Sequence, residues 1–260
     1  MKPLRTLMPE TVLILKRRRT MIIAGILLAA AIFAVIFSPR VVGVAATTRV
    51  LPIYSVQRDN KAVSLTFDAA WGNEDTDDLI SILGKYNIRA TFFLVGNWVD
   101  KYPESVKALS DAGHEVMNHS NDHAHFARLS ASQIAANVNA CSDKIEAITG
   151  VRPTLFRCPY GEYDDNVITA VQSTGTTAIQ WDVDSLDWKD LDAATIRERV
   201  TSRVRPGSIV LFHNAALHTP EALPGIIEFL LHNGYSIVPV SELLLTGDYY
   251  IDHTGRQIPM

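Results

Sequence analysis

Short apolar runs and amphipathic segments alternate along most of the chain. The strand-like runs are AVSLTFD (62–68), RATFFLVG (89–96), HEVMNH (114–119), TLFRC (154–158), TTAIQWDV (176–183), GSIVLFHN (207–214) and YSIVPV (235–240). The amphipathic segments between them include residues 75–87, 130–150 and 219–234. Such alternation predicts parallel strands joined by helices, so we expect an α/β domain.

The segment at residues 130–150 has the boundaries of a helix. Ser130 can accept a hydrogen bond from a backbone N–H of the first turn, and Gly150 can take the left-handed conformation that ends many helices. Both ends therefore support the helical interpretation.

Reactive side chains stand at, or just after, the ends of five strand-like runs. They are Asp68, His119, Arg157, Asp184 and His213. The carboxyl ends of parallel strands share one face of an α/β fold, and active sites are built on that face. We therefore expect these side chains to lie together.

His119 and His123 have the H-x-x-x-H spacing. On a helical turn this spacing brings two imidazoles to one side, where both can reach one metal ion. His125 makes the segment His-rich, so a surface pair is the alternative interpretation.

Arg157 and His213 each predict an acidic partner. A guanidinium near an apolar strand end usually fixes a carboxylate in bidentate hydrogen bonds, and a structural ion pair is the alternative. A histidine beside an acid is typical of a general acid that works near neutral pH. The acidic segment DVDSLDWKDL (182–191) offers such partners.

Five motifs carry a resemblance to a known family. TFDAAWG, HSNDH, RCPY, DSLDW and LFHN occur in this order, within residues 62 to about 240. They resemble the motifs of the polysaccharide deacetylase family, the NodB-homology or carbohydrate esterase 4 group, and are most similar to its sporulation-type PdaB subgroup. The resemblance implies a distorted (β/α) barrel of seven or eight strands. It also implies metal-assisted hydrolytic N-deacetylation of an amino-sugar polymer, peptidoglycan-like or chitin-like.

The resemblance further implies roles for single residues near the attacking water. Asp68 matches the general base, and Arg157 matches the residue that orients it. The backbone N–H of Tyr160 matches an oxyanion donor. His119 and His123 match two ligands of a divalent metal, commonly zinc.

Other residues match the proton donor and the substrate pocket. Asp187 matches the acid that tunes the catalytic histidine, and His213 matches that histidine, which protonates the departing amine. Trp188 and Leu211 match the walls of a pocket for the acetyl methyl group.

Position 69 departs from the family pattern. Members read T-F-D-D, and the second Asp is the third metal ligand, whereas this chain has Ala69. Catalytic zinc usually has three protein ligands. Four outcomes stay open: Asp68 turns toward the metal, an acid of NEDTDD (73–78) reaches in, water fills the place, or metal binding has been lost.

Two other functions stay open. A catalytically weak or inactive barrel that binds glycans is favoured by Ala69, and an amidase of a small non-sugar amide would use the same motifs. The first is opposed by a set of retained chemical residues, namely Asp68, Arg157, Asp187 and His213.

The N-terminal stretch is typical of a membrane anchor. Four adjacent basic residues, 16–19, precede MIIAGILLAAAIFAVIF (21–37), which has no polar side chain. Its length approaches the ~20 apolar residues that cross a bilayer, and the basic cluster should stay in the cytoplasm. We expect a single-pass protein of the cytoplasmic membrane with an extracytoplasmic domain. Secretion after cleavage near VVGVAA (41–46) is the alternative.

The expected organisation follows from these features. It is a cytoplasmic basic segment (1–20), a transmembrane anchor (21–38), a linker (39–60), a deacetylase domain (61–245) and a C-terminal tail (246–260). The formal net charge of −4 argues against nucleic acid as a partner. The expected partners are an N-acetylated glycan and, through the N-terminal helix, the membrane; no protein partner is inferred.

Overall fold

A computed structural model describes residues 18–29 and 49–260. The described residues fall into two units, one within Met1–Thr48 and the other Arg49–Met260. Residues 18–29 form a helix. In the part of the chain that the structure describes, no helix is both long and apolar enough to span a bilayer. The predicted anchor at 21–38 runs past residue 29, outside the described residues, and stays a prediction.

The unit from Arg49 to Met260 is built on an eight-stranded sheet with parallel pairings. The strand order is β6-β5-β4-β3-β2-β8-β7, and β9 also pairs with β2. The strands are β2 (Ala62–Ala69), β3 (Thr91–Leu94), β4 (Glu115–Asn118), β5 (Leu155–Phe156), β6 (Thr177–Ala178), β7 (Val183–Asp184), β8 (Ile209–His213) and β9 (Ser236–Ile237). The predicted α/β class with parallel strands is confirmed.

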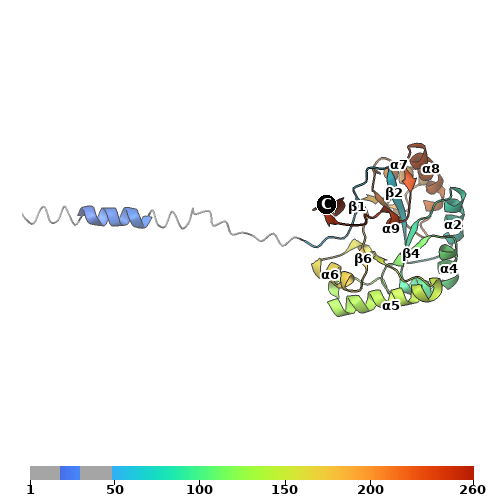
Figure 1. Cartoon of the computed structure of the whole chain (residues 1–260), viewed down its shortest axis with the longest axis horizontal. Coiled ribbons are helices and arrows are strands. Elements are labelled where there is room, and N and C mark those ends of the chain that lie inside the picture. The colour runs from blue at the N-terminus through green and yellow to red at the C-terminus, as the bar shows by residue number, and fades with distance from the viewer. Residues whose placement is uncertain (1–17, 30–48) are drawn as a thin grey trace, which may run out of the picture. The chain divides into compact units, whose positions relative to one another are not determined.

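Helices connect these strands and surround them (Figure 1). They are α2 (Thr76–Lys85), α3 (Gly96–Lys101), α4 (Pro103–Asp111), α5 (Ala131–Thr149), α6 (Asp165–Ser173), α7 (Ala193–Thr201), α8 (Thr219–His232) and α9 (Val240–Leu243). Short 3-10 turns are η1 (Phe126–Arg128), η2 (Pro159–Gly161) and η3 (Asp187–Lys189). Turns η2 and η3 follow β5 and β7, so they lie at the carboxyl end of the sheet.

Helix α5 has both predicted boundaries. The Ser130 side chain accepts a hydrogen bond from the Gln133 N–H, and the Gln133 side chain bonds back to the Ser130 N–H, which forms a capping box. Gly150 ends the helix with a φ of 74°. The buried face has helical spacing and comprises Ile134, Val138, Cys141 and Ile145.

Strand β2 separates the hydrophobic core from the polar site by the alternation of its side chains. Phe67 stacks on Phe92 and Phe212, with ring centroids 4.8 and 5.4 Å apart. Ala69 belongs to the same hydrophobic cluster. Asp68, between Phe67 and Ala69, is outside that cluster and lines a pocket.

Parts of the predicted linker and tail contribute to the folded unit. Strand β1 (Ser55–Val56) pairs with β11 (Arg256–Pro259), which also pairs with β10 (Tyr249–Ile251). Ile53 is buried and bridges to Ile179, so it interrupts the strand predicted at 176–183, which splits into β6 and β7. Two-residue strands are too short to show a period, so the sequence pattern did not reveal them.

Candidate active site

The predicted site residues converge at the carboxyl ends of the strands. A pocket of about 420 Å³ is lined by seven of the nine, namely Asp68, His119, His123, Tyr160, Trp188, Leu211 and His213. The other two, Arg157 and Asp187, are fully buried and bond to pocket residues. The side chains that follow the strand ends therefore lie together, as expected for the carboxyl ends of parallel strands.

Asp68 is held by a buried arginine. Arg157 Nη1 donates to Asp68 Oδ1 at 2.7 Å and to Thr66 Oγ1 at 2.9 Å. Arg157 Nη2 donates to the Gln180 carbonyl oxygen at 3.2 Å. The guanidinium also lies 4.2 Å from the ring centroid of Phe93. The pair has one direct hydrogen bond rather than the predicted bidentate contact, because Nη2 is used by the backbone.

The surroundings of Asp68 favour its ionised form. Burial by itself would raise the pKa of this carboxyl. The charges of Arg157, His119 and His213 overcome burial and lower the pKa of Asp68 below its ordinary value of 3.8. Asp68 is therefore an anion at neutral pH.

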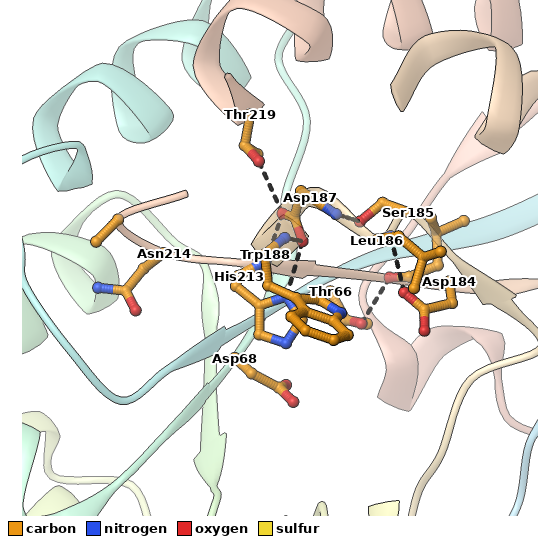
Figure 2. Close-up of polar contacts among 12 residues, drawn as sticks. Thr66, Asp68, Asp184, Ser185, Leu186, Asp187, Trp188, His213, Asn214 and Thr219 are labelled. Atoms are coloured by element: carbon orange, nitrogen blue, oxygen red, sulfur yellow. Dashed lines mark hydrogen bonds and ion pairs between the residues drawn. The ribbon is translucent and has the colours of Figure 1, made fainter. Parts of the chain in front are cut away.

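Asp187 accepts four hydrogen bonds and fixes the ring of His213 (Figure 2). Its Oδ1 accepts from His213 Nδ1 at 2.8 Å and from the Trp188 N–H at 2.9 Å. Its Oδ2 accepts from the His213 N–H at 2.8 Å and from Thr219 Oγ1 at 2.7 Å. This bonding leaves His213 Nε2 as the ring nitrogen available to a substrate.

The pKa of His213 responds to two opposing causes. Burial alone would lower this pKa. The hydrogen bond and charge of Asp187, with the charges of Asp68 and Asp184, raise the pKa of His213 above its ordinary value of 6.5. The protonated form of His213 therefore persists to a higher pH than that of an ordinary histidine.

His119 and His123 lie side by side, with ring centroids 5.1 Å apart. A loop brings them together rather than the predicted helical turn, because β4 ends at Asn118 and both Ser120 and His123 have positive φ. The His123 N–H donates to Ser120 Oγ at 2.9 Å and holds this loop. His119 Nδ1 bonds to the Arg157 carbonyl oxygen at 2.9 Å, which leaves Nε2 3.5 Å from Asp68 Oδ2.

Both imidazoles are neutral at physiological pH. Burial lowers the pKa of His119, and burial together with its neighbour lowers the pKa of His123 to about 4. A neutral imidazole nitrogen can act as a ligand of zinc.

Within residues 18–29 and 49–260, His119 and His123 have no third protein ligand beside them. Among the described residues, no group of three or more His, Cys, Asp or Glu side chains has the arrangement of a metal site. Ala69 belongs to the hydrophobic cluster, and Asp68 is bonded to Arg157. Asp75, the buried acid of the 73–78 segment, instead accepts from the Ala215 N–H at 2.9 Å. The side chains present do not complete the three-ligand set of a catalytic zinc site.

Tyr160 lies in a tightly held turn with a φ of 59°. Its ring contacts those of His123 and His125, with centroids 4.4 and 4.3 Å away. Gln180 Nε2 donates to the carbonyl oxygen of Gly161 at 3.3 Å. The predicted oxyanion donor therefore belongs to a turn that is fixed from two sides.

Two tryptophans that shape the pocket were not predicted from the sequence. Trp71 and Trp181 line it, and the ring of Trp71 lies 5.5 Å from that of His123. Trp71 is 61% exposed and Trp188 is 55% exposed. The available signal was position, because Trp71 lies three residues after Asp68 and Trp181 directly precedes the acidic segment at 182–191. Cys141 and Cys158 are both free and buried.

Comparisons with known proteins converge on one family. A family model described as polysaccharide deacetylase matches residues 55–179. Peptidoglycan-N-acetylmuramic acid deacetylase PdaC of Bacillus subtilis is 36% identical over 189 residues, which are 73% of this chain and 40% of PdaC. Peptidoglycan-N-acetylglucosamine deacetylase of Bacillus cereus is 31% identical over 192 residues, which are 72% of this chain and 70% of that protein. The chain spans about half the length of several curated relatives that it matches.

Solved structures of the same family include both a protein described as a pseudoenzyme and a mutant of it described as active. Wild-type BA3943 of Bacillus anthracis, described as a CE4 family pseudoenzyme, is 36% identical with a TM-score of 0.72, over 74% of this chain and 68% of that chain. A BA3943 mutant described as having restored enzymatic activity is 37% identical, with a TM-score of 0.71 over 74% of this chain and 70% of that chain.

Proposed function

The chain belongs to the polysaccharide deacetylase family, and from this membership we propose that it hydrolyses N-acetyl groups of a cell-wall amino-sugar polymer, peptidoglycan-like or chitin-like. One observation carries the proposal. Asp68, which is held by Arg157, and His213, which is held by Asp187, line the same pocket from the adjacent strands β2 and β8. The names of PdaC and the Bacillus cereus relative favour peptidoglycan as the polymer.

The two pairs suit the two proton transfers of amide hydrolysis. In the register of β2 and β8, Asp68 lies directly opposite His213. Asp68 accepts a proton from the attacking water, and protonated His213 gives one to the departing nitrogen. The Tyr160 N–H donates to the oxyanion that forms between these steps.

The aromatic lining suits a sugar ring. Trp71, Tyr160 and Trp188 are each more than half exposed and line the pocket. Apolar ring faces of this kind cover the C–H face of a sugar, while the polar groups between them fix its orientation. Leu211 adds an apolar wall beside His213, which suits the acetyl methyl group.

The proposed location is outside the cytoplasmic membrane, with a single N-terminal anchor. The basic residues before the apolar run at 21–37 support this orientation. Protease added to intact cells should digest the domain, and a protected domain would reject the outward orientation. A role in sporulation, from the likeness to the PdaB subgroup, belongs to the same proposal.

A glycan-binding barrel with little or no hydrolysis is the second candidate. Ala69 and the incomplete set of metal ligands favour it, as does the likeness to BA3943, described as a pseudoenzyme. It differs from the first candidate in acetate release, not in glycan binding.

Acetate release separates the candidates. The full chain should be incubated with N-acetylated peptidoglycan, chitooligosaccharides and a small N-acetyl amide, in chelator and with added zinc. We expect the parent protein to release acetate from one of the polymers, and we expect the His213→Ala variant to lose this activity. Binding of the polymer without release in any condition would support the second candidate, and release from the small amide alone would identify an amidase.

The pH dependence of kcat should reflect the shifted pKa values of His213 and Asp68. His213 must be protonated to donate, and its pKa is raised above 6.5, so kcat should persist above pH 6.5 and fall as the pH rises through that raised pKa. Asp68 must be ionised, and its pKa is lowered below 3.8, so the acid limb should lie below that pH. The stability contributed by the His213 pair should likewise be complete below pH 6.5 and lost above the raised pKa. An alkaline limb at or below pH 6.5 would contradict the role of His213.

Trp188→Ala should weaken substrate binding more than it slows the chemical step. Removing an aromatic wall loses apolar burial of about 1.5 kcal/mol, which corresponds to a roughly tenfold rise in KM. Tyr250→Ala is a matched control, because Tyr250 is also exposed but lies on β10, outside the pocket. Steady-state kinetics on a soluble oligomer measures both variants, and equal KM values for the two would remove Trp188 from the binding site.

A further inference from the structure

The carboxylate of Asp187 depends on donors because it is buried away from water. Asp187 is fully buried, so each lone pair without a donor in the protein carries a desolvation cost. Two of its four donors belong to His213, and one is the neighbouring Trp188 N–H. The fourth donor comes from a residue outside all five sequence motifs.

That residue is Thr219, the first residue of helix α8 (Thr219–His232). Figure 2 shows its side chain pointing from the helix toward Asp187. Thr219 is fully buried, and its hydroxyl donates to Asp187 Oδ2 at 2.7 Å. Its own N–H donates to the Ala216 carbonyl oxygen, and Pro220 has no N–H. Within these first two residues of α8, the hydroxyl is therefore the donor that reaches the carboxylate.

The helix adds a favourable potential to this contact. Asp187 faces the amino-terminal end of α8, where the partial positive charge of the helix stabilises an anion. The Thr219 hydroxyl and the His213 N–H hold Oδ2 together, and Oδ1 is thereby directed at His213 Nδ1. A shift of the first turn of α8 would therefore move the Asp187 carboxylate and, through it, the imidazole of His213.

We infer that Thr219 is a positioning residue that fixes Asp187 and, through it, the orientation of His213 for proton donation. The inference rests on the proposed function for its kinetic consequence. Its structural consequence, the geometry of the hydrogen bond between His213 and Asp187, can be measured without any turnover.

Thr219→Val tests the hydroxyl, because valine keeps the shape of the side chain and removes the donor. We expect kcat to fall roughly threefold to tenfold, a part of the 10²–10⁴ that general acid catalysis contributes, with KM nearly unchanged. Thr219→Ser keeps a hydroxyl and should restore kcat. Proton NMR of ¹⁵N-histidine-labelled protein should show the His213 Nδ1–H resonance displaced in the valine variant and returned in the serine variant.

Thr176→Val is the matched control. Thr176 is also buried, and its hydroxyl bonds to the Val171 carbonyl oxygen at 3.1 Å and to Thr174 Oγ1 at 2.8 Å, so the hydrogen bonds of a buried threonine hydroxyl are lost away from Asp187. It should lower stability without moving the His213 resonance or kcat. If Thr219→Val does not fold, Thr219→Ala, which relieves any crowding, takes its place.

The outcomes are distinct. A displaced resonance with serine rescue supports the inference, even if the parent protein releases no acetate and the proposed function fails. An unchanged resonance and kcat in the valine variant overturn it. A rise in KM alone, or an equal displacement in Thr176→Val, also overturns it.

Discussion

Arg157→Met is expected to lower the free energy of unfolding by about 3–5 kcal/mol, because it leaves a buried carboxylate without its cation. Arg157 is fully buried and donates to Asp68, which is 5% exposed. Methionine fills much of the volume but supplies no charge. His119 then remains beside Asp68, with 3.5 Å between His119 Nε2 and Asp68 Oδ2. Urea unfolding at neutral pH measures the loss.

Two further variants make this result interpretable. Arg152→Met is the control, because Arg152 pairs with Asp143 and Glu146 on the surface, where an ion pair contributes about 0–1 kcal/mol. Adding Asp68→Leu to Arg157→Met removes both buried charges and should recover much of the stability. Equal losses in Arg157→Met and Arg152→Met would contradict a buried ion pair that the fold depends on.

Asp187→Asn is expected to lower kcat by roughly 10²–10⁴, the usual contribution of general acid catalysis. Both carboxylate oxygens accept two hydrogen bonds, and an amide nitrogen cannot accept any. The NH₂ group of the asparagine must therefore face two hydrogen-bond donors that it cannot accept from. Without the negative charge of Asp187, the pKa of His213 loses the largest of the causes that raise it, and the alkaline limb of the pH–rate profile should move to lower pH.

Asp190→Asn is the control for Asp187→Asn. It makes the same chemical change three residues further along, at an exposed position with a φ of 53°, a conformation that asparagine adopts readily. Its kcat and pH–rate profile should match those of the parent. An active Asp187→Asn variant with an unchanged pH–rate profile would remove Asp187 from the proton-donor pair.

The predictable parts of the fold were those with strong local signals. Helix α5 could be delimited because Ser130 and Gly150 act through their own backbone neighbourhoods. The pairing of β1 with β11 could not be predicted, since it joins residues about 200 positions apart along the chain and no local period records it. The same cause hid the break between β6 and β7, where distant Ile53 replaces a strand neighbour.

The site was predictable where topology alone decides position. Asp68, His119, Arg157 and His213 converge because parallel strands present their carboxyl ends on one face. The sequence also predicts that the Ala69 side chain points away from Asp68 and toward the core, because adjacent residues of a strand point to opposite faces. Thr219 was not, because its contact with Asp187 depends on how α8 packs after a loop.

The Ile53 bridge has a mechanical consequence. Ile53 donates to the Ala178 carbonyl oxygen and accepts from the Gln180 N–H, and two residues later Ser55 bridges to Ser208. A tensile load applied at Arg49 would therefore reach the sheet within a few residues. The two hydrogen bonds of Ile53 and the bridge at Ser55 would be among the first contacts in the folded unit to bear it. Gln180, which donates to Ile53, also accepts from Arg157 through its carbonyl oxygen, so a pull on this segment would act one hydrogen bond away from the residue that holds Asp68.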